Sequence, residues 1–369
     1  MRVLLTVPSL AREFGGPAGK ARELAEALRA GGAEVRLVGA GESDEYGVTA
    51  LGEVARFHAT PVPRAVQPLR HLVPGADVVH VLGFRDPVGT IAARDARRAG
   101  VPYVLEPTGM LRRRLRSRWL KRAFDGTVGR TVIEGAAVVI ATSDLEAVEL
   151  RDGGVPGERI RVRPNGVRFD GLLPLPERGA FRRTHGIPAG VPLVLAIARI
   201  GAVKGLRVLV RAILGIPGCH VAIAGPDECD GTLEDLQTFL RSHALGERAL
   251  LLPQGVWGDG KREALADADV FCLPSEYESF GTAAAEAAGC GLPVVTTSGC
   301  GVADVLDASA SRVVAPGEVQ ALAEAIRQVL GPGATREAAR RSAPALRKRL
   351  DWRGLAADQL QIYRDVSGA

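Results

Sequence analysis

The sequence lacks any apolar run close to the ~20 residues that a membrane-spanning helix needs. Its five cysteines are scattered and form no CxxC pair; they are Cys219, Cys229, Cys272, Cys290 and Cys300. The N-terminal stretch MRVLLTVPSLAREFGG is apolar too briefly for a secretory signal and predicts a first strand. These absences predict a reduced, cytoplasmic protein, with peripheral attachment to the inner face of the plasma membrane left open.

Motifs for cofactors and metals are missing as well. GAGESD at 39–44 lacks the third glycine of the dinucleotide fingerprint, and GGPAGKA at 15–21 fails the P-loop pattern in spacing and in its last residue. No HExxH, no GxSxG and no His/Asp cluster with metal-ligand spacing occurs. We therefore expect neither a cofactor nor a metal, and the missing glycine fingerprint argues against a nicotinamide-dependent oxidoreductase.

What is present describes a globular protein of two domains. Of the 369 residues, 46% are hydrophobic and 24% are charged, which is typical of a soluble folded chain. Residues 1–168 carry 26 Lys and Arg against 19 Asp and Glu, a net charge of +7. Residues 169–369 carry 21 against 23, a net charge of −2. The basic first half suggests an anionic partner, such as a membrane surface, a lipid phosphate or nucleic acid.

Short apolar runs alternate with amphipathic segments twice along the chain, first from RVLLTV to RIRVRPNGV and again from PLVLAIAR onward. Strands separated by helices of this length predict parallel sheets. We expect an α/β fold of two doubly wound halves, with a linker at LLPLPERGAF and a boundary after residue 168. Ligands bind outside the carboxyl ends of strands in such sheets, so a site is expected in the cleft where the two sheets face each other.

The stretch PSEYESFGTAAAEAAGCGLPVV, residues 274–295, predicts an anion site. Ser279, Phe280, Gly281 and Thr282 form a turn that opens an alanine-rich helix, which Ser279 or Thr282 can cap. Unpaired amides of a first helical turn suit a diphosphate, and glycine allows a phosphate to come close.

Two glutamates flank this turn. Glu278 precedes the helix and Glu286 lies about one turn inside it. A carboxylate near a helix N-terminus stabilises the helix by ~0.3–1 kcal/mol, which would explain either residue alone. Carboxylates also accept paired hydrogen bonds from vicinal sugar hydroxyls, so the pair is interpreted as gripping sugars on either side of a diphosphate.

Two cations follow a predicted strand in ARIGAVKGL. Arg199 ends the strand and Lys204 follows a short loop; either they neutralise a departing diphosphate, or they form a solvated loop pair. Lysine occurs only five times against 42 arginines, so Lys204 is atypical of this composition. GPDECDG at 225–231 either contacts a base or only turns the chain. Gly15 and Gly16 either bring amides to the donor phosphate or belong to a surface loop.

The segment MLRRRLRSRWLKR, residues 110–122, predicts a basic amphipathic helix. It suits an anionic membrane interface or acceptor, or it is a solvated helix whose stems cover the core. Nucleic acid is not expected, since no stacking pattern of aromatics accompanies the charge. The candidate membrane contacts are Arg112, Arg113, Arg114, Arg116, Arg118, Trp119, Lys121 and Arg122.

Taken together, these motifs resemble those of a known family, the retaining glycosyltransferases of the GT-B fold, family 4. The resemblance is carried by GGPAGKARELAEALRAGGAEV, DVVHVLG, EPTGML, IRVRPNGV, ARIGAVKGL, IAGPDE and the E-x7-E pattern of Glu278 and Glu286. It implies two Rossmann-like domains, 1–168 on the acceptor side and 169–350 for the nucleotide sugar, with 351–369 crossing back as a helix. It also implies transfer from a UDP-, GDP- or ADP-sugar to a glycan or lipid-linked acceptor, with retention and without a metal, in polysaccharide, glycolipid or glycoconjugate biosynthesis.

The resemblance assigns roles to matching positions. Arg199 and Lys204 would bind the diphosphate, Glu286 the ribose, Glu278 the donor sugar, and Gly16 would lie near the phosphates. Many members have a histidine where this chain has Thr108, so the resemblance assigns no imidazole role at this position.

Thr108 and Glu106 remain candidate cleft residues. His80, on a different strand end, is either a further cleft candidate or a structural residue. Two other functions stay open: a GT-B sugar-nucleotide epimerase or hydrolase, and a non-catalytic, membrane-associated binding module.

Overall fold

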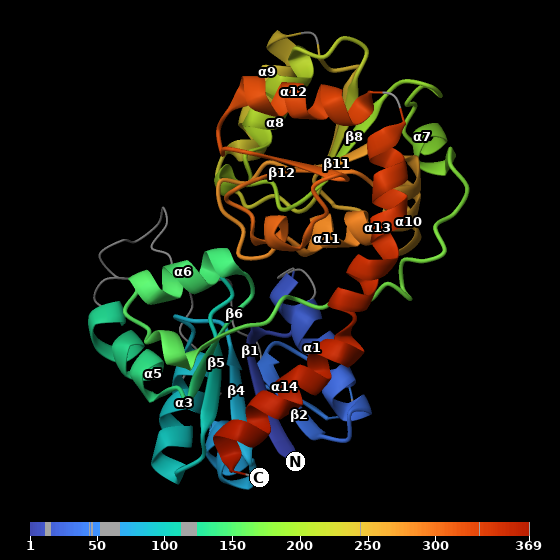
Figure 1. The fold of residues 1–369 in the computed structure, drawn as a ribbon. Helices are drawn as coiled ribbons and strands as arrows, with labels where there is room; N and C mark the ends of the chain where they lie inside the picture. Colours follow the sequence, from blue (N-terminus) through green and yellow to red (C-terminus); the bar gives the residue numbers. More distant parts are fainter. Residues whose placement is uncertain are drawn as a thin grey trace. The chain divides into compact units, whose positions relative to one another are not determined.

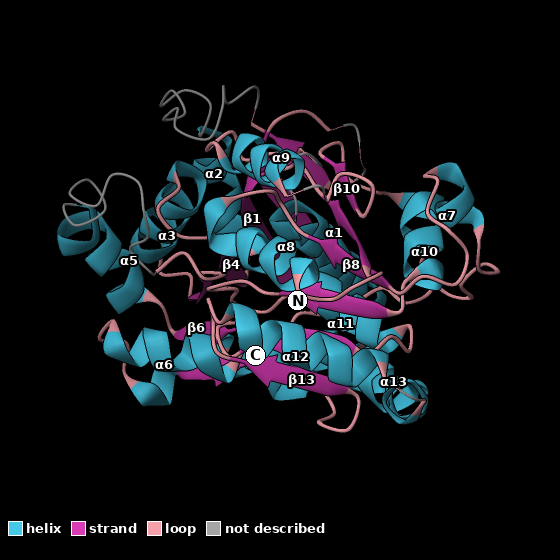
Figure 2. Cartoon of the chain, turned by 90° about the horizontal axis from the view of Figure 1, so that it is seen from above, coloured by secondary structure: helices cyan, strands magenta, loops and turns pink. Residues whose placement is uncertain are grey.

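The computed structural model describes residues 1–11, 16–43, 45, 47–51, 67–111, 124–243, 245–331 and 333–368. The chain divides into two compact units. Unit 1 consists of Met1–Gly166 and Leu350–Ala369, and unit 2 of Val167–Arg349. Within both units strands alternate with helices along the chain (Figure 1; Figure 2). No helix in the described ranges is long and apolar enough to cross a bilayer.

Unit 1 is built on a seven-stranded parallel sheet of order β3-β2-β1-β4-β5-β6-β7. Its strands are β1 (Arg2–Ser9), β2 (Glu34–Ala40), β3 (Val48–Ala50), β4 (Val78–Leu82), β5 (Tyr103–Glu106), β6 (Val138–Ala141) and β7 (Ile160–Val162). Its helices are α1 (Gly16–Ala30), α2 (Gln67–Leu72), α3 (Pro87–Ala99), α5 (Arg130–Gly135), α6 (Asp144–Asp152) and α14 (Trp352–Ser367), with short turns at Val73–Gly75, Asp125–Gly129 and Gly157–Arg159.

The sheet of unit 1 has a hydrophobic core on each face. In β1, Leu4 belongs to the core shared with α3 and α5, whereas Val3 and Leu5 belong to the core shared with α1 and α14. Alternate side chains of a strand point to opposite faces, so a strand buried on both sides is apolar at nearly every position. This explains the continuous run RVLLTV and confirms the predicted doubly wound arrangement for this unit.

Unit 2 repeats the plan with a six-stranded parallel sheet of order β10-β9-β8-β11-β12-β13. Its strands are β8 (Leu193–Ile197), β9 (His220–Ala224), β10 (Ala249–Leu252), β11 (Val270–Leu273), β12 (Val294–Thr297) and β13 (Ser311–Val314). Its helices are α7 (Ala180–Thr184), α8 (Leu206–Leu214), α9 (Thr232–Ser242), α10 (Gly258–Asp267), α11 (Thr282–Gly289), α12 (Val319–Leu330) and α13 (Ala334–Leu350), with short turns at Ala202–Lys204 and Gly301–Val305. Figure 1 shows α8, α9 and α12 on one face of this sheet and α10, α11 and α13 on the other.

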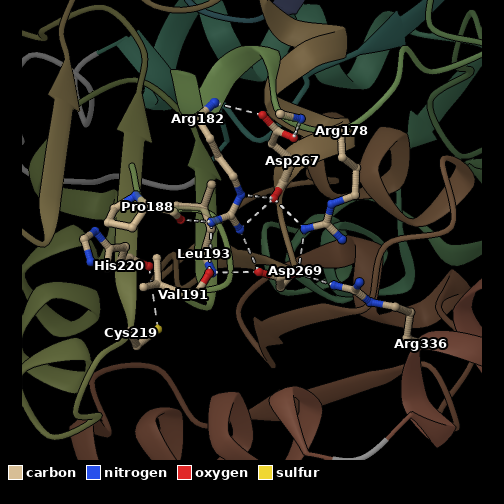
Figure 3. A network of polar contacts seen from close by, with 11 residues as sticks. Arg178, Arg182, Pro188, Val191, Leu193, Cys219, His220, Asp267, Asp269 and Arg336 are labelled. Atoms are coloured by element: carbon tan, nitrogen blue, oxygen red, sulfur yellow. Dashed lines mark hydrogen bonds and ion pairs between the residues drawn. The ribbon is translucent and has the colours of Figure 1, made fainter. Parts of the chain in front are cut away.

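A network of arginines and aspartates lies at the amino-terminal end of the unit 2 sheet, where the central strands β8 and β11 begin (Figure 3). Asp269 accepts hydrogen bonds from Arg178 at 2.7 Å, Arg182 at 3.0 Å and Arg336 at 2.5 Å, and from the amide of Leu193 at 2.9 Å. Burial raises the pKa of Asp269, but these donors outweigh it and hold the net pKa below its usual range. One carboxylate thus ties the segment entering unit 2 and helix α13 to the sheet.

Replacing Asp269 with asparagine is expected to destabilise unit 2 by about 2–4 kcal/mol, because three guanidinium groups lose their shared anion in a half-buried setting. Thermal unfolding of the variant would measure the loss. Asp259→Asn is the matched control, since Asp259 is 84% exposed and pairs with Arg262 three residues on; the loss of stability should stay under about 1 kcal/mol. Equal effects of the two substitutions would contradict this role of Asp269.

Candidate functional site

The candidate site of unit 2 begins where the strand order reverses. After β8 the chain continues outward to β9 and β10, whereas β11 lies on the other side of β8. The loops that follow β8 and β11 therefore separate above their carboxyl ends, which is where doubly wound sheets bind ligands. Lys204 lies in the loop after β8 and Glu278 in the loop after β11, and the two form an ion pair through Nζ and Oε2. The structure thus brings together two residues that the sequence predicted separately.

The backbone around Lys204 is fixed by the loop of its partner. The amide of Glu276 donates to the carbonyl of Val203 at 2.9 Å. Gly205 follows with φ 64°, and a Cβ at this position would lie 2.0 Å from the carbonyl oxygen of Pro274. Only glycine tolerates both the left-handed conformation and this approach. Lys204, whose side chain is only 10% exposed, is therefore held in position before any ligand arrives.

Glu278 is fixed from its other side by the loop after β12. Its amide donates to the carbonyl of Gly299 at 2.8 Å, and its carbonyl accepts from the amide of Gly301 at 2.9 Å. A Cβ at Gly299 would lie 2.3 Å from the carbonyl oxygen of Glu276. Three loops, following β8, β11 and β12, thus join through backbone hydrogen bonds, and Glu278 lies in the middle one.

Helix α11 begins directly after this loop, at the predicted Thr282, but its N-cap residue differs from the prediction. Gly281, with φ 98°, holds the N-cap position, so the prediction that Ser279 or Thr282 caps the helix is wrong. A Cβ at Gly281 would lie 2.9 Å from Cδ2 of Leu273, so glycine is needed here for the backbone itself. The side chain of Phe280 is 1% exposed, and the donor-binding role of the turn 279–282 stays a prediction.

Glu286 lies on the second turn of α11 and pairs with Lys261 of α10 at 2.6 Å. Both side chains are partly exposed, at 16% and 20%. The sequence interpretation missed Lys261, although the signal that singled out Lys204, the rarity of lysine in this chain, applied to it equally.

Arg199 follows the carboxyl end of β8 and pairs with Glu228 at 2.6 Å. Glu228 belongs to the GPDECDG loop after β9, for which the sequence left two roles open. The described side chains of this region thus form three cation–carboxylate pairs: Arg199 with Glu228, Lys204 with Glu278, and Lys261 with Glu286. Cations suited to phosphates and carboxylates suited to hydroxyl groups therefore lie on the loops after β8, β9 and β11 and on helices α10 and α11.

In unit 1 the structure corrects two predictions. Glu106 and His80 are 0% exposed, so neither is a cleft residue open to an acceptor. Glu106 pairs with Lys20, with Arg163 at 2.6 Å and with Nε2 of His80 at 3.2 Å. His80 also contacts the hydroxyl of Tyr363 on α14 through Nδ1 at 2.6 Å. The carboxylate thus serves as the shared anion of a buried cluster inside unit 1.

The charge state of Glu106 follows from this cluster. Burial alone raises the pKa of its carboxyl, but the positive charges of Arg163 and Lys20 and the hydrogen bond from His80 outweigh burial and bring the pKa well below its usual range. Burial lowers the pKa of His80. At neutral pH the cluster therefore holds an ionised carboxylate and a neutral imidazole.

The remaining candidates are distributed as follows. Thr108 lies in the loop after β5 with φ 53°, a rare conformation for a β-branched residue. The amide of the next residue, Gly109, donates to Oε1 of buried Glu146 at 2.5 Å. Gly16 is exposed as the first residue of α1. Gly15 and the whole basic set, Arg112, Arg113, Arg114, Arg116, Arg118, Trp119, Lys121 and Arg122, lie outside the described residues. In the part of the chain that is described, no group of three His, Cys, Asp or Glu side chains could hold a metal.

Sequence comparisons agree with this division of the chain. The family model for glycosyl transferases group 1 matches residues 177–345, and that for the glycosyl transferase 4-like domain matches residues 15–166. The D-inositol 3-phosphate glycosyltransferase of Xylanimonas cellulosilytica is 31% identical over 249 residues, which are 64% of this chain and 58% of that protein. In four of the curated relatives, including this one, the region that matches the chain covers between 44% and 60% of the relative's own length.

Solved structures share the fold over nearly the whole chain. Sucrose-phosphate synthase from Thermosynechococcus elongatus has a TM-score of 0.80 at 21% identity, covering 99% of this chain and 98% of that one. Anabaena HepE, solved in complex with UDP and glucose, has a TM-score of 0.79 at 19% identity, covering 98% and 99%. At such identities the likeness concerns the fold, and it confirms the predicted GT-B class.

Proposed function

Because the chain belongs to the GT-B glycosyltransferases of the family 4 type, we propose that it transfers a sugar from a nucleoside-diphosphate sugar to an acceptor hydroxyl with retention of the anomeric configuration. The observation that carries this proposal is the contact between Lys204 and Glu278 at the strand-order reversal of unit 2. A cation for the diphosphate and a carboxylate for the sugar are adjacent there. HepE, with a similar fold, was solved with UDP-glucose, which supports a nucleotide sugar as the donor.

In the proposed ground state the donor replaces internal ion-pair partners. The diphosphate would accept hydrogen bonds from Arg199 and Lys204, Glu286 would accept from the ribose hydroxyls, and Glu278 from hydroxyls of the sugar. Each of these side chains is already oriented by a partner of opposite charge. Preorganised charges of this kind stabilise a developing leaving-group charge without reorganisation.

The proposed reaction breaks the bond between the anomeric carbon and the phosphate oxygen, and forms a bond from that carbon to the acceptor oxygen on the same face. The acceptor proton passes to an oxygen of the departing diphosphate. Lys204 would neutralise the charge on that phosphate, so no side chain needs to serve as nucleophile. A metal-independent reaction is part of this proposal, with Arg199 and Lys204 supplying the positive charge.

The proposed acceptor is a glycan or a lipid-linked molecule, in the assembly of a polysaccharide, glycolipid or glycoconjugate. The support comes from sequence: seven of residues 112–122 are Lys or Arg, which suits an acceptor or membrane surface with negative charge. The chain's first 168 residues carry the excess of positive charge.

Screening UDP-, GDP- and ADP-sugars for thermal stabilisation should identify one donor group, since a ligand that binds only the folded form raises the melting temperature. At 100 times its Kd a donor stabilises by about 2.7 kcal/mol. With that donor, proton NMR of the product should show the donor's anomeric configuration, with equal rates in EDTA. Binding of none of these donors, an inverted product, or turnover to an epimer or free sugar in place of transfer would contradict the proposal.

A further inference from the structure

The acidic loop after β9, residues 225–231, contacts the loop that carries Arg199. The amide of Glu228 donates to the carbonyl of Ile200 at 2.9 Å, and the amide of Ile200 donates to the carbonyl of Pro226 at 2.8 Å. These bonds extend the parallel pairing of β8 and β9 beyond the strands. They hold the Glu228 carboxylate beside Arg199, where Oε1 lies 2.6 Å from Nη1.

Two glycines make this approach possible. A Cβ at Gly201 would lie 2.3 Å from Oε2 of Glu228, and a Cβ at Gly225 would lie 2.0 Å from the carbonyl oxygen of Ala198. Any side chain at Gly201 would displace the carboxylate from Arg199, and any side chain at Gly225 would push the two loops apart. The position of Glu228 therefore follows from the local backbone, which leaves room for its carboxylate only because both residues are glycine.

The neighbouring acids have other partners. Asp230 accepts from the amides of Ala202 at 2.9 Å and Thr232 at 3.0 Å, and Asp227 accepts from the amide of Cys229 at 3.1 Å. Glu278 and Glu286, in the other two ion pairs, have proposed roles toward sugar hydroxyls. Glu228 instead neutralises the cation proposed to bind phosphate, so its charge opposes the binding of an anionic ligand at Arg199.

We propose that Glu228 is an internal anion that competes with the nucleoside diphosphate for Arg199 and thereby favours its release after transfer; this rests on the proposed function above. The product repels the Glu228 carboxylate more strongly than the donor does. Transfer leaves a terminal phosphate that ionises a second time near pH 6, which adds a negative charge. Arg199 is 46% exposed and Glu228 23% exposed, so water can solvate both groups when they separate. The exchange between internal and bound anion is therefore not hindered by burial.

Glu228→Gln tests the proposal because it keeps the shape of the side chain and removes its charge. We expect the Kd for UDP, GDP or ADP, measured by calorimetry, to fall on the order of tenfold for whichever nucleotide binds the wild type. In an Arg199→Ala background the same substitution should change the Kd by less than about twofold, because the competition requires the guanidinium. Glu234→Gln is the matched control. Glu234 is exposed in the first turn of α9, and its substitution changes the net charge by the same amount as Glu228→Gln.

The sign of the effect separates competition from positioning. If Glu228 only oriented Arg199, Glu228→Gln would weaken nucleotide binding, and a weaker or unchanged Kd overturns the proposal. Tighter binding in both Glu228→Gln and Glu234→Gln would also overturn it, since net charge alone would explain the gain. If the wild type binds none of UDP, GDP and ADP, the proposed function itself fails; if it binds one and Glu228→Gln binds no tighter, only this inference fails.

Discussion

Replacing Lys204 with alanine is expected to lower kcat/KM for sugar transfer about 10²–10³-fold, the usual loss when one preorganised charge is removed from a developing anion. Lys204 is the most enclosed cation of the site, with a side chain 10% exposed, and its loop is hydrogen-bonded to the loop that carries Glu278. An ammonium group held in this way needs no reorganisation when the phosphate leaves. The loss should appear in kcat as well as in KM, because the proposed interaction strengthens in the transition state.

Two further variants define this prediction. Lys204→Arg keeps the charge but places a larger, planar group beside Glu278, and we expect it to recover only part of the activity. Lys348→Ala is the control, since Lys348 is exposed on α13 and its substitution removes one positive charge from the same unit. Activity of Lys204→Ala within about threefold of the wild type would contradict the role of this lysine.

The second large effect concerns stability of unit 1. Replacing Glu106 with glutamine is expected to destabilise the protein by about 3–5 kcal/mol, because it leaves Lys20 and Arg163 buried without their anion. The side chains of Lys20 and Arg163 are 8% and 3% exposed, so water cannot replace the lost charge. Urea unfolding would measure the loss, and hydrogen exchange should show it in unit 1 and not in unit 2.

A second substitution distinguishes an unpaired charge from a packing defect. Adding Lys20→Met to Glu106→Gln removes one of the two uncompensated cations and should restore part of the stability. Glu134→Gln is the control, since Glu134 is 58% exposed and pairs with Arg130 four residues earlier; its effect should be about 0.5 kcal/mol or less. The role of Glu106 would be contradicted if Glu106→Gln and Glu134→Gln proved equally stable.

The fold class could be predicted from sequence because buried parallel strands leave a strong local signal. Runs such as RVLLTV are mostly apolar, and they recur between amphipathic helices in both halves. Local patterns do not show strand order, so the reversal between β8 and β11 came only with the structure. The N-cap of α11 was also missed: the sequence favoured Ser279 or Thr282, whereas Gly281 holds that position, and a Cβ there would lie 2.9 Å from Cδ2 of Leu273 on the preceding strand.

The site was predictable where one stretch carries several of its groups. Glu278 and Glu286 lie eight residues apart, and Arg199 and Lys204 five apart, so sequence alone exposes both pairs. Their partners Glu228 and Lys261 come from other loops, and no spacing relates them to the residues they contact. Burial was not predicted either. Glu106 is the last residue of β5, where a cleft residue could lie, but its contacts with Lys20 of α1 and with Arg163, the residue after β7, enclose it.

The most direct test of the donor site is a crystal structure of the chain with the nucleoside diphosphate of its donor. We predict phosphate oxygens about 2.7–3.2 Å from the Arg199 guanidinium and from Nζ of Lys204, with ribose hydroxyls donating to Glu286. A nucleotide bound elsewhere, with Arg199 still paired to Glu228 and Lys204 still paired to Glu278, would contradict the account.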